Sequence, residues 1–241
     1  MLNRIILSAT SALILAVLTQ AASAKSERDI KLVLQITVDG LRGDLLNRYA
    51  NSFGNSGFKY LMHNGTVYTN AHYQHANTET IVGHTTLATG TFPSQHGMVG
   101  NVIYDRKANE LSYNIEDADA PLLPSREQSS AGDQVDPSQK ISRTKGRSPR
   151  AMQVPGLADT LAAYTAGKSK IFAVSGKDRS AVAMAGHAGK AFWLSSDNGD
   201  FITSKYYYES NPDWVQDWNN HRLAEKYRDT DWKLSSANDR Y

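Results

Sequence analysis

The residues with the clearest chemical potential lie in the stretch from His75 to Asn101. Its apolar segment, residues 81–88, predicts a short helix that stops near Gly90, and Pro93 predicts a turn after it. A hydroxyl at the start of a helix meets unpaired backbone N–H groups and the positive end of the helix dipole, where an anion binds readily. Thr80 is therefore a candidate nucleophile, and its ordinary alternative role is to cap that helix.

A second candidate, Asp39, follows the run KLVLQITV at residues 31–38. This run is rich in aliphatic and β-branched residues and predicts a buried strand that ends in an Asp39-Gly40 turn. Open α/β sheets bind their ligands outside the carboxyl ends of strands, so Asp39 would lie at such an edge. The alternative is that Asp39 caps a helix over residues 41–49.

Two cations, Lys177 and Arg179, follow a second predicted strand at residues 170–174 and a Ser175-Gly176 turn. Arginine offers a planar fork and lysine a compact point charge, and both suit phosphate oxygens. The alternative is a solvated pair of surface charges split by Asp178, which would contribute little to stability.

The elements around these residues predict an α/β fold. Helices are expected at residues 41–49, 58–63 and 155–167, a strand at 66–71, a hairpin of strands at 191–195 and 201–207, and a helix that begins at Asn211-Pro212-Asp213. Residues 105–152 are polar and lack a sustained apolar period, so they predict a surface excursion or lid.

The composition is that of a globular domain with a sizeable core. The chain has 241 residues, no cysteine, 21% charged residues and a formal net charge of +2. Basic and acidic residues are interspersed, which argues against a nucleic-acid binder. The lack of cysteine excludes disulfides and a thiolate zinc site.

The first 24 residues read as a secretory signal peptide. A basic start at residues 1–4 precedes a mostly apolar segment at 5–18 and the small-residue pattern Ala22-Ser23-Ala24. The apolar segment is too short for a membrane-spanning helix. We therefore expect export to the periplasm or the exterior, with no stable membrane anchor after cleavage.

Asp217 and His221 have a spacing that places both side chains on one face of the last predicted helix. Such a pair can hold zinc. The setting, a helix that also carries Trp214 and Trp218, favours an ordinary contact within the helix instead.

Three blocks in this order resemble the alkaline phosphatase superfamily: KLVLQITVDGLRGD, the stretch from His75 to Asn101, and FAVSGKDRSAVAMAGH. More narrowly, they resemble the periplasmic phosphate-irrepressible alkaline phosphatases, which use a threonine nucleophile and a Lys-x-Arg pair. The resemblance implies an alkaline-phosphatase-like α/β/α sandwich with a mostly parallel central sheet. It also implies small phosphate monoesters as substrates and two zinc ions as cofactors.

By this resemblance, Thr80 is the nucleophile that forms a phosphothreonine intermediate, and Asp39 is a zinc ligand beside it. Thr80 would also contact the metal. Asn101, Lys177 and Arg179 would hold the phosphoryl oxygens. A metal-activated hydroxyl is chemically necessary, because a threonine hydroxyl is a poor nucleophile at neutral pH.

The chain departs from the family in its metal ligands. Similar enzymes add an Asp-x-x-x-His pair, an adjacent Asp-His and a late histidine, but this chain contains no Asp-His dipeptide. Residues 25–241 are therefore expected to be the N-terminal part of such a domain. His72, His75 and His84 could serve as ligands, and His84 is expected to fix the turn at Thr80.

Two alternatives remain. One is a non-catalytic half-domain that lacks most metal ligands. The other is a relative that hydrolyses phosphodiesters or nucleotide pyrophosphates.

Overall fold

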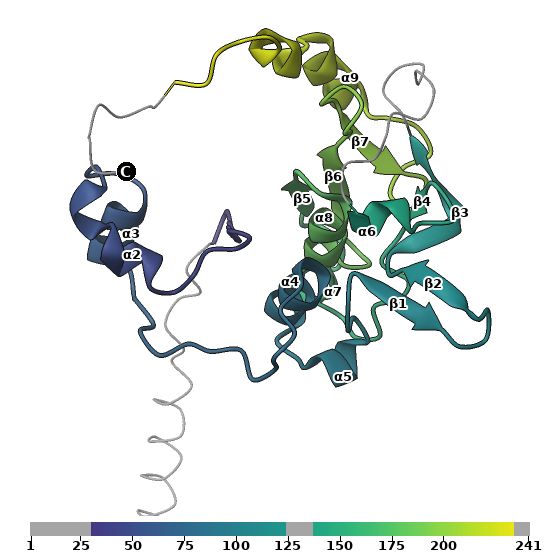
Figure 1. The fold of residues 1–241 in the computed structure, drawn as a ribbon, viewed down its shortest axis with the longest axis horizontal. Helices are drawn as coiled ribbons and strands as arrows, with labels where there is room; N and C mark the ends of the chain where they lie inside the picture. The colour runs from purple at the N-terminus through teal and green to yellow at the C-terminus, as the bar shows by residue number, and fades with distance from the viewer. Residues whose placement is uncertain (1–29, 124–136, 234–241) are drawn as a thin grey trace, which may run out of the picture. The chain divides into compact units, whose positions relative to one another are not determined.

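The structure is a computed structural model that describes residues 30–123 and 137–233 (Figure 1). The predicted signal peptide, residues 1–24, lies outside the described residues. The chain divides into two compact units, Met1–Arg42 and Gly43–Tyr241, which we describe separately.

The described part of the first unit contains no strand, so the strand predicted at residues 31–38 is wrong for this structure. Its apolar side chains are exposed, with Leu32 at 77% and Leu34 at 72% of their full accessible surface. The physical reason is that an extended segment becomes a strand only when a neighbour accepts its backbone hydrogen bonds. Within the described residues none does so. The turn expected at Asp39-Gly40 is present, with Gly40 at φ +72°.

The second unit begins with short helical elements. The helix predicted at residues 41–49 is reduced to α2 (Leu45–Arg48) and a 3₁₀ turn, η1 (Ala50–Ser52). The helix predicted at 58–63 is present as α3 (Phe58–Asn64). The strand predicted at 66–71 is wrong, because these residues are exposed and unpaired with any described strand.

A five-stranded sheet in the order β4-β3-β7-β6-β5 forms the centre of the second unit. The strands are β3 (Glu116–Leu123), β4 (Gly146–Arg147), β5 (Phe172–Ser175), β6 (Lys190–Leu194) and β7 (Phe201–Ser204). Only β5 and β6 pair in parallel among the described strands, so the sheet is mixed rather than mostly parallel. The cause is local: a tight turn joins β6 to β7, which forces antiparallel pairing, whereas α8 (Asp178–Ala185) crosses over between β5 and β6.

Helices cover both faces of this sheet, as the α/β/α expectation requires (Figure 1). On one face α8 packs on β5 and β6, and α4 (Thr80–Thr89) packs on α8. Ala173, Ala191 and Trp193 point into that core. On the other face, Trp214 of α9 (Asp213–Asn220) contacts the ring of Phe192. Alternate residues of a strand face opposite sides, which is why neighbours in β6 serve two layers.

The remaining elements complete the unit. They are α5 (Pro93–His96), α6 (Pro137–Lys140), α7 (Leu157–Tyr164), the 3₁₀ helix η2 (Leu223–Tyr227), and a two-stranded sheet of β1 (Val102–Asp105) and β2 (Glu110–Tyr113). The predicted hairpin is present as β6 and β7, and the helix predicted at 155–167 is present as α7. The predicted start of α9 is close to the observed one, with Pro212 rather than Asn211 at the cap position.

The segment at residues 105–152 is not a surface excursion in its described parts. It supplies β2, β3 and β4, and it buries Tyr113, Ile115 and Arg147. Its polar composition is misleading because Arg147, one of its charged residues, is buried in an ion pair with Asp178.

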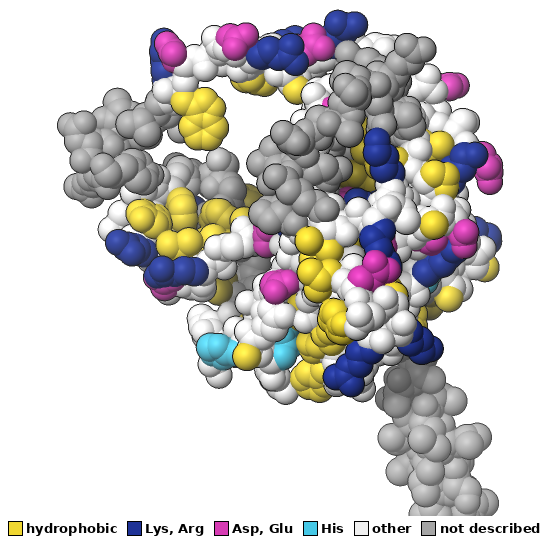
Figure 2. Space-filling view, turned by 45° about the vertical axis from the view of Figure 1, so that its right-hand side comes forward, with side chains coloured by type: hydrophobic (Ala, Val, Ile, Leu, Met, Phe, Trp, Pro, Cys, Tyr) yellow, Lys and Arg dark blue, Asp and Glu magenta, His cyan; other side chains and the backbone are white. Residues whose placement is uncertain are grey.

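Positive and negative side chains are interspersed on the face shown in Figure 2. This face therefore presents no large field of a single sign. Among the described residues, no helix has the length and apolar character needed to cross a membrane.

Candidate active site

Thr80 is the first residue of α4, at the end where the helix leaves backbone N–H groups unpaired. Glu79, not Thr80, is the cap residue, and it makes no side-chain capping bond. The hydroxyl of Thr80 is thus not consumed as a cap. Nδ1 of His84, one turn later, donates to the Thr80 carbonyl oxygen at 2.8 Å, which confirms that His84 fixes this turn. The helix ends at Gly90 in the left-handed conformation (φ +68°), as expected.

Asn101 is held against the start of α4 by two hydrogen bonds. Its Oδ1 accepts the backbone N–H of Ile81 at 3.1 Å, and its own backbone N–H donates to Oε2 of Glu79 at 2.6 Å. A backbone N–H can only donate, so the Asn101 side-chain atom that contacts the Ile81 N–H must be the amide oxygen. The other side-chain atom, Nδ2, is the amide group that can donate.

Lys177 and Arg179 have different environments, although both follow β5. Lys177 is the cap residue of α8 and is exposed. Arg179 lies in the first turn of α8 and is only 3% exposed. The two cations therefore do not form a solvated surface pair.

A buried charge cluster surrounds Arg179. Asp178, 1% exposed, accepts from Nε of Arg147 at 2.7 Å and from the hydroxyl of Tyr113 at 2.7 Å. Nη1 of Arg179 donates to the same hydroxyl at 3.3 Å. Burial, and then the charge of Asp178, raise the pKa of Tyr113 above its ordinary range, so this hydroxyl keeps its proton.

The residue after Tyr113 connects the two blocks. The backbone N–H of Asn114 donates to the Asn101 carbonyl oxygen at 3.1 Å, and its Nδ2 donates to that of Gly100 at 2.8 Å. Through the dipeptide Tyr113-Asn114, the structure thus ties the turn at Asn101 to Arg179. Thr80, Asn101 and Arg179, distant in sequence, belong to one contiguous set of contacts.

Sequence reasoning missed Glu79, Tyr113, Asn114 and Arg147, and it treated Asp178 only as a charge that separates two cations. No local pattern marks the first four. The one available signal was Asp178 itself, because an acid between two cations next to a strand end needs a partner if it is buried.

Asp39 lies in the first unit, where it is exposed in the turn with Gly40. Its predicted place at the carboxyl end of a buried strand is not observed, because residues 31–38 are not a strand here. Its proposed role as a metal ligand stays a prediction.

The described residues contain no group of three or more histidine, aspartate or glutamate side chains that could hold a metal ion. Nε2 of His72 contacts Oδ1 of Asn70 at 2.9 Å, and Nδ1 of His75 donates to the carbonyl oxygen of Asn77 at 2.8 Å. These residues alone therefore do not fit a complete zinc site, and we derive no step through one.

His221 and Asp217 form no side-chain pair among the described contacts. Nδ1 of His221 donates to the main-chain oxygen of Asp217 at 2.9 Å, which is an ordinary contact within the last turn of a helix. The spacing alone was not a ligand signal.

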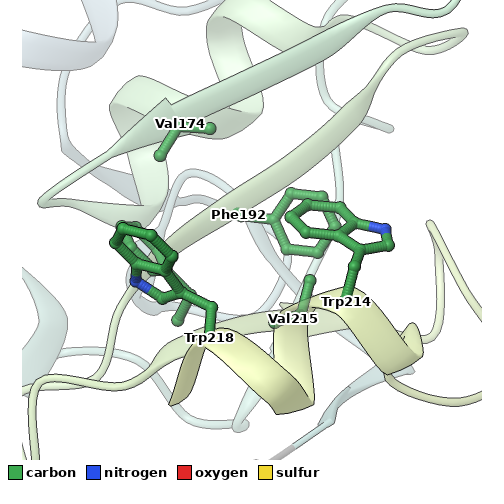
Figure 3. A pocket seen from close by; sticks show the side chains of 6 residues that line it. Val174, Phe192, Trp214, Val215 and Trp218 are labelled. Carbon is green, nitrogen blue, oxygen red and sulfur yellow. The ribbon is translucent and has the colours of Figure 1, made fainter. Parts of the chain in front are cut away.

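An apolar cavity of about 180 Å³ lies apart from these residues, between α9 and the sheet. Figure 3 shows Trp214, Val215 and Trp218 pointing from α9 towards Val174 and Phe192. None of the candidate catalytic residues lines it.

Comparison with known proteins gives the family. The model of the type I phosphodiesterase / nucleotide pyrophosphatase family matches residues 33–240. The chain belongs to this family. The match covers all three sequence blocks except the first two residues of the first one.

The relatives of this family member include named alkaline phosphatases. The chain is 35% identical to alkaline phosphatase PafA of Elizabethkingia meningoseptica over 204 residues, which is 84% of this chain and 35% of PafA. It is 33% identical to alkaline phosphatase PhoV of Synechococcus elongatus, over 84% of this chain and 34% of PhoV. The chain thus spans about a third of the length of these relatives.

Solved structures confirm the alkaline-phosphatase-like α/β fold. The crystal structure of wild-type PafA matches with a TM-score of 0.70 and 31% identity, covering 81% of this chain and 35% of PafA. A PafA variant, in which a threonine is replaced by serine and an asparagine, a lysine and an arginine by alanine, matches with a TM-score of 0.72, covering 83% and 36%.

Proposed function

We propose that this chain carries the nucleophile and phosphate-binding residues of an exported, zinc-dependent phosphate monoester hydrolase. The observation that carries the proposal is the fixed amide of Asn101, whose Oδ1 accepts the backbone N–H of Ile81, the residue after Thr80, in the first turn of α4. A nucleophilic hydroxyl, a helix N-terminus and an oriented amide are among the parts that phosphoryl-transfer sites use.

In the proposed reaction, Oγ1 of Thr80 attacks the phosphorus atom in line with the leaving oxygen. The bond between phosphorus and that oxygen breaks, and the proton of the Thr80 hydroxyl ends on the departing alcohol. Water then hydrolyses the phosphothreonine and releases inorganic phosphate. Nδ2 of Asn101 and the cations Lys177 and Arg179 stabilise the charge on the remaining phosphoryl oxygens.

Zinc enters the proposal through the family resemblance, with Asp39 and Thr80 as proposed ligands. A zinc ion held there would supply Lewis-acid charge that activates a hydroxyl at neutral pH. The signal peptide predicted at residues 1–24 supports the proposed export to the periplasm or the exterior of the cell.

The substituted residue types of the PafA variant support the site assignment. Its threonine and asparagine have the same separation along the chain as Thr80 and Asn101, and its lysine and arginine the same as Lys177 and Arg179. Thr80, Asn101, Lys177 and Arg179 are the four positions that the second and third sequence blocks single out here.

The family description favours a second candidate, hydrolysis of phosphodiesters or nucleotide pyrophosphates. A monoester presents three non-bridging oxygens and a diester only two. Residues that hold a third oxygen therefore favour monoesters, and Lys177 and Arg179 are additional donors beyond Asn101.

The test compares hydrolysis of a chromogenic phosphate monoester and the matching diester by the zinc-supplied protein, beside Thr80→Ala and Thr80→Ser. We expect monoester turnover to be lost in Thr80→Ala and partly kept in Thr80→Ser, which retains the hydroxyl. Acid quenching should trap one phosphoryl group on the peptide that contains Thr80. A preference for the diester would favour the second candidate. Absence of turnover of either ester by the soluble protein would favour the non-catalytic alternative.

A further inference from the structure

The hydroxyl of Tyr113 lies between a buried carboxylate and a buried guanidinium. An ionised carboxylate can only accept hydrogen bonds, so the hydroxyl donates to Oδ1 of Asp178, at 2.7 Å. Its lone pairs then face Nη1 of Arg179, which donates to it at 3.3 Å. The direction of both bonds is thus set by chemistry, and the Tyr113 oxygen is an acceptor with a fixed orientation.

The carboxylate that orients Tyr113 is itself immobilised. Oδ2 of Asp178 accepts from Nε of Arg147 at 2.7 Å, and its Oδ1 also accepts the backbone N–H of Arg179 at 2.8 Å. The guanidinium of Arg147 lies over the Tyr113 ring, 4.9 Å from its centroid. Nη1 of Arg147 donates to the carbonyl oxygens of Thr144 and Gly146 at 2.9 and 2.8 Å. The cluster therefore joins β4, the end of β2 and α8 into one rigid unit.

The same stretch of backbone reaches the other part of the candidate site. Asn114, next to Tyr113, donates to the carbonyl oxygens of Gly100 and Asn101. A single dipeptide at the end of β2 therefore contacts both the turn that carries the Asn101 amide and the side chain of Arg179. Its backbone sets the separation between them.

We infer that Tyr113 is a positioning residue that fixes the guanidinium of Arg179 relative to Asn101 for binding a phosphoryl group. This inference rests on the proposed function, and it adds a residue that does not itself touch the substrate. An arginine held in one orientation loses less side-chain entropy when it binds an anion than a mobile one does, and it keeps its donors aligned with two oxygens.

The competing explanation is purely structural: the hydroxyl of Tyr113 would serve only to satisfy Asp178. Both explanations expect Tyr113→Phe to lower stability. They differ in whether the loss in activity depends on Arg179, so a double-mutant cycle separates them.

The experiment measures kcat and KM for a chromogenic phosphate monoester and its diester in the wild-type protein, Tyr113→Phe, Arg179→Ala and the double variant. We expect Tyr113→Phe to lower monoester kcat/KM about tenfold, the size expected for one lost bond to a charged donor. It should lower diester kcat/KM less, and it should cause no further loss in the Arg179→Ala background. Tyr206→Phe is the matched control, because its hydroxyl donates to the carbonyl oxygen of His187, at 3.3 Å, and to no candidate site residue among the described contacts, so the rate should not change.

A spectroscopic readout does not depend on turnover. In protein with ¹⁵N-labelled arginine, Tyr113→Phe should broaden or shift the side-chain NMR signals of Arg179 and leave Arg147 bonded to Asp178. Equal fractional losses of kcat/KM with and without Arg179, together with unchanged Arg179 signals, would overturn the positioning role while leaving the proposed function intact. A wild-type protein that turns over neither ester would instead overturn the proposed function, whatever the NMR signals show.

Discussion

The two parts of the candidate site are built in opposite ways. Around Thr80 and Asn101, the contacts lie near the surface, and Glu79, which accepts the Asn101 backbone N–H, is exposed. Around Arg179, the charged groups are inside the protein, with Asp178 at 1% and Arg147 at 3% exposure. We refer to these as the surface part and the buried part of the site.

The difference has an energetic consequence. A buried carboxylate costs several kcal/mol unless it is paired and hydrogen-bonded, whereas an exposed hydrogen bond can be replaced by water. Changes in the buried part should therefore act first on stability, and changes in the surface part should act first on catalysis. Each prediction below tests one side of this comparison.

The largest effect is expected from Arg147→Met. Removing the guanidinium leaves Asp178 buried without its ionic partner, and breaking such a pair costs about 3–5 kcal/mol. The measurement is the free energy of unfolding from urea titration, followed by fluorescence of the tryptophan residues.

Arg150→Met is the matched control, since its side chain is 55% exposed and contacts Asp117 and Asp119 at the surface. A surface ion pair contributes about 0–1 kcal/mol, so this variant should remain close to the wild-type protein. If both substitutions lowered the free energy of unfolding equally, the buried ion pair of Arg147 would contribute no more to stability than the surface contacts of Arg150.

A large effect on catalysis with little effect on stability is expected from Asn101→Asp. The new carboxylate keeps the acceptor for the backbone N–H of Ile81 but replaces the Nδ2 donor with a negative charge. Loss of one such donor lowers the rate about 10²–10³-fold. The measurement is kcat/KM for the monoester, with the unfolding midpoint as the check on stability.

Glu79→Gln provides a graded comparison within the surface part. It keeps an acceptor for the Asn101 backbone N–H but removes the charge, so kcat/KM should fall by about fivefold or less.

If Asn101→Asp lowered stability more than activity, the surface part would be a structural element and not a binding element.

Sequence patterns predicted the elements whose signals are local. The helix α4 follows from the apolar residues 81–88 and its stop at Gly90, and the pairing of β6 with β7 follows from the short turn between them. The proposed nucleophile Thr80 is at the start of this predicted helix. The helix α8, which follows Lys177, was not predicted.

Sequence patterns failed where a structure depends on a distant partner. The apolar run at residues 31–38 has the composition of a strand, but composition cannot supply the neighbouring backbone that a strand requires. Conversely, the polar segment at 105–152 supplies Tyr113 and Arg147, whose burial depends on Asp178 far along the chain. The burial of Arg179 was missed for the same reason.

The last expected effect depends on pH and acts through a buried histidine that contacts α4. His96 is fully buried, and its Nδ1 accepts the backbone N–H of Met98 at 3.1 Å. The neutral ring therefore carries its proton on Nε2, which donates to the Thr86 hydroxyl at 3.1 Å. That hydroxyl is left to donate to Nε2 of His75, at 3.0 Å. A second proton on His96, at Nδ1, would face the Met98 N–H and remove the acceptor of that bond.

Burial, and then the charge of a protonated His75, lower the pKa of His96 below its ordinary value. The folded protein therefore resists binding a proton that the unfolded chain accepts, and stability should fall as the pH drops below about 6.5 towards the lowered pKa. One proton limits the slope to about 1.4 kcal/mol per pH unit. Urea titrations from pH 7.5 to about 5 should show this slope in the wild-type protein and in His221→Gln, whose ring is exposed. The slope should be smaller in His96→Gln. An unchanged slope in that variant would show that another group causes the loss of stability in acid.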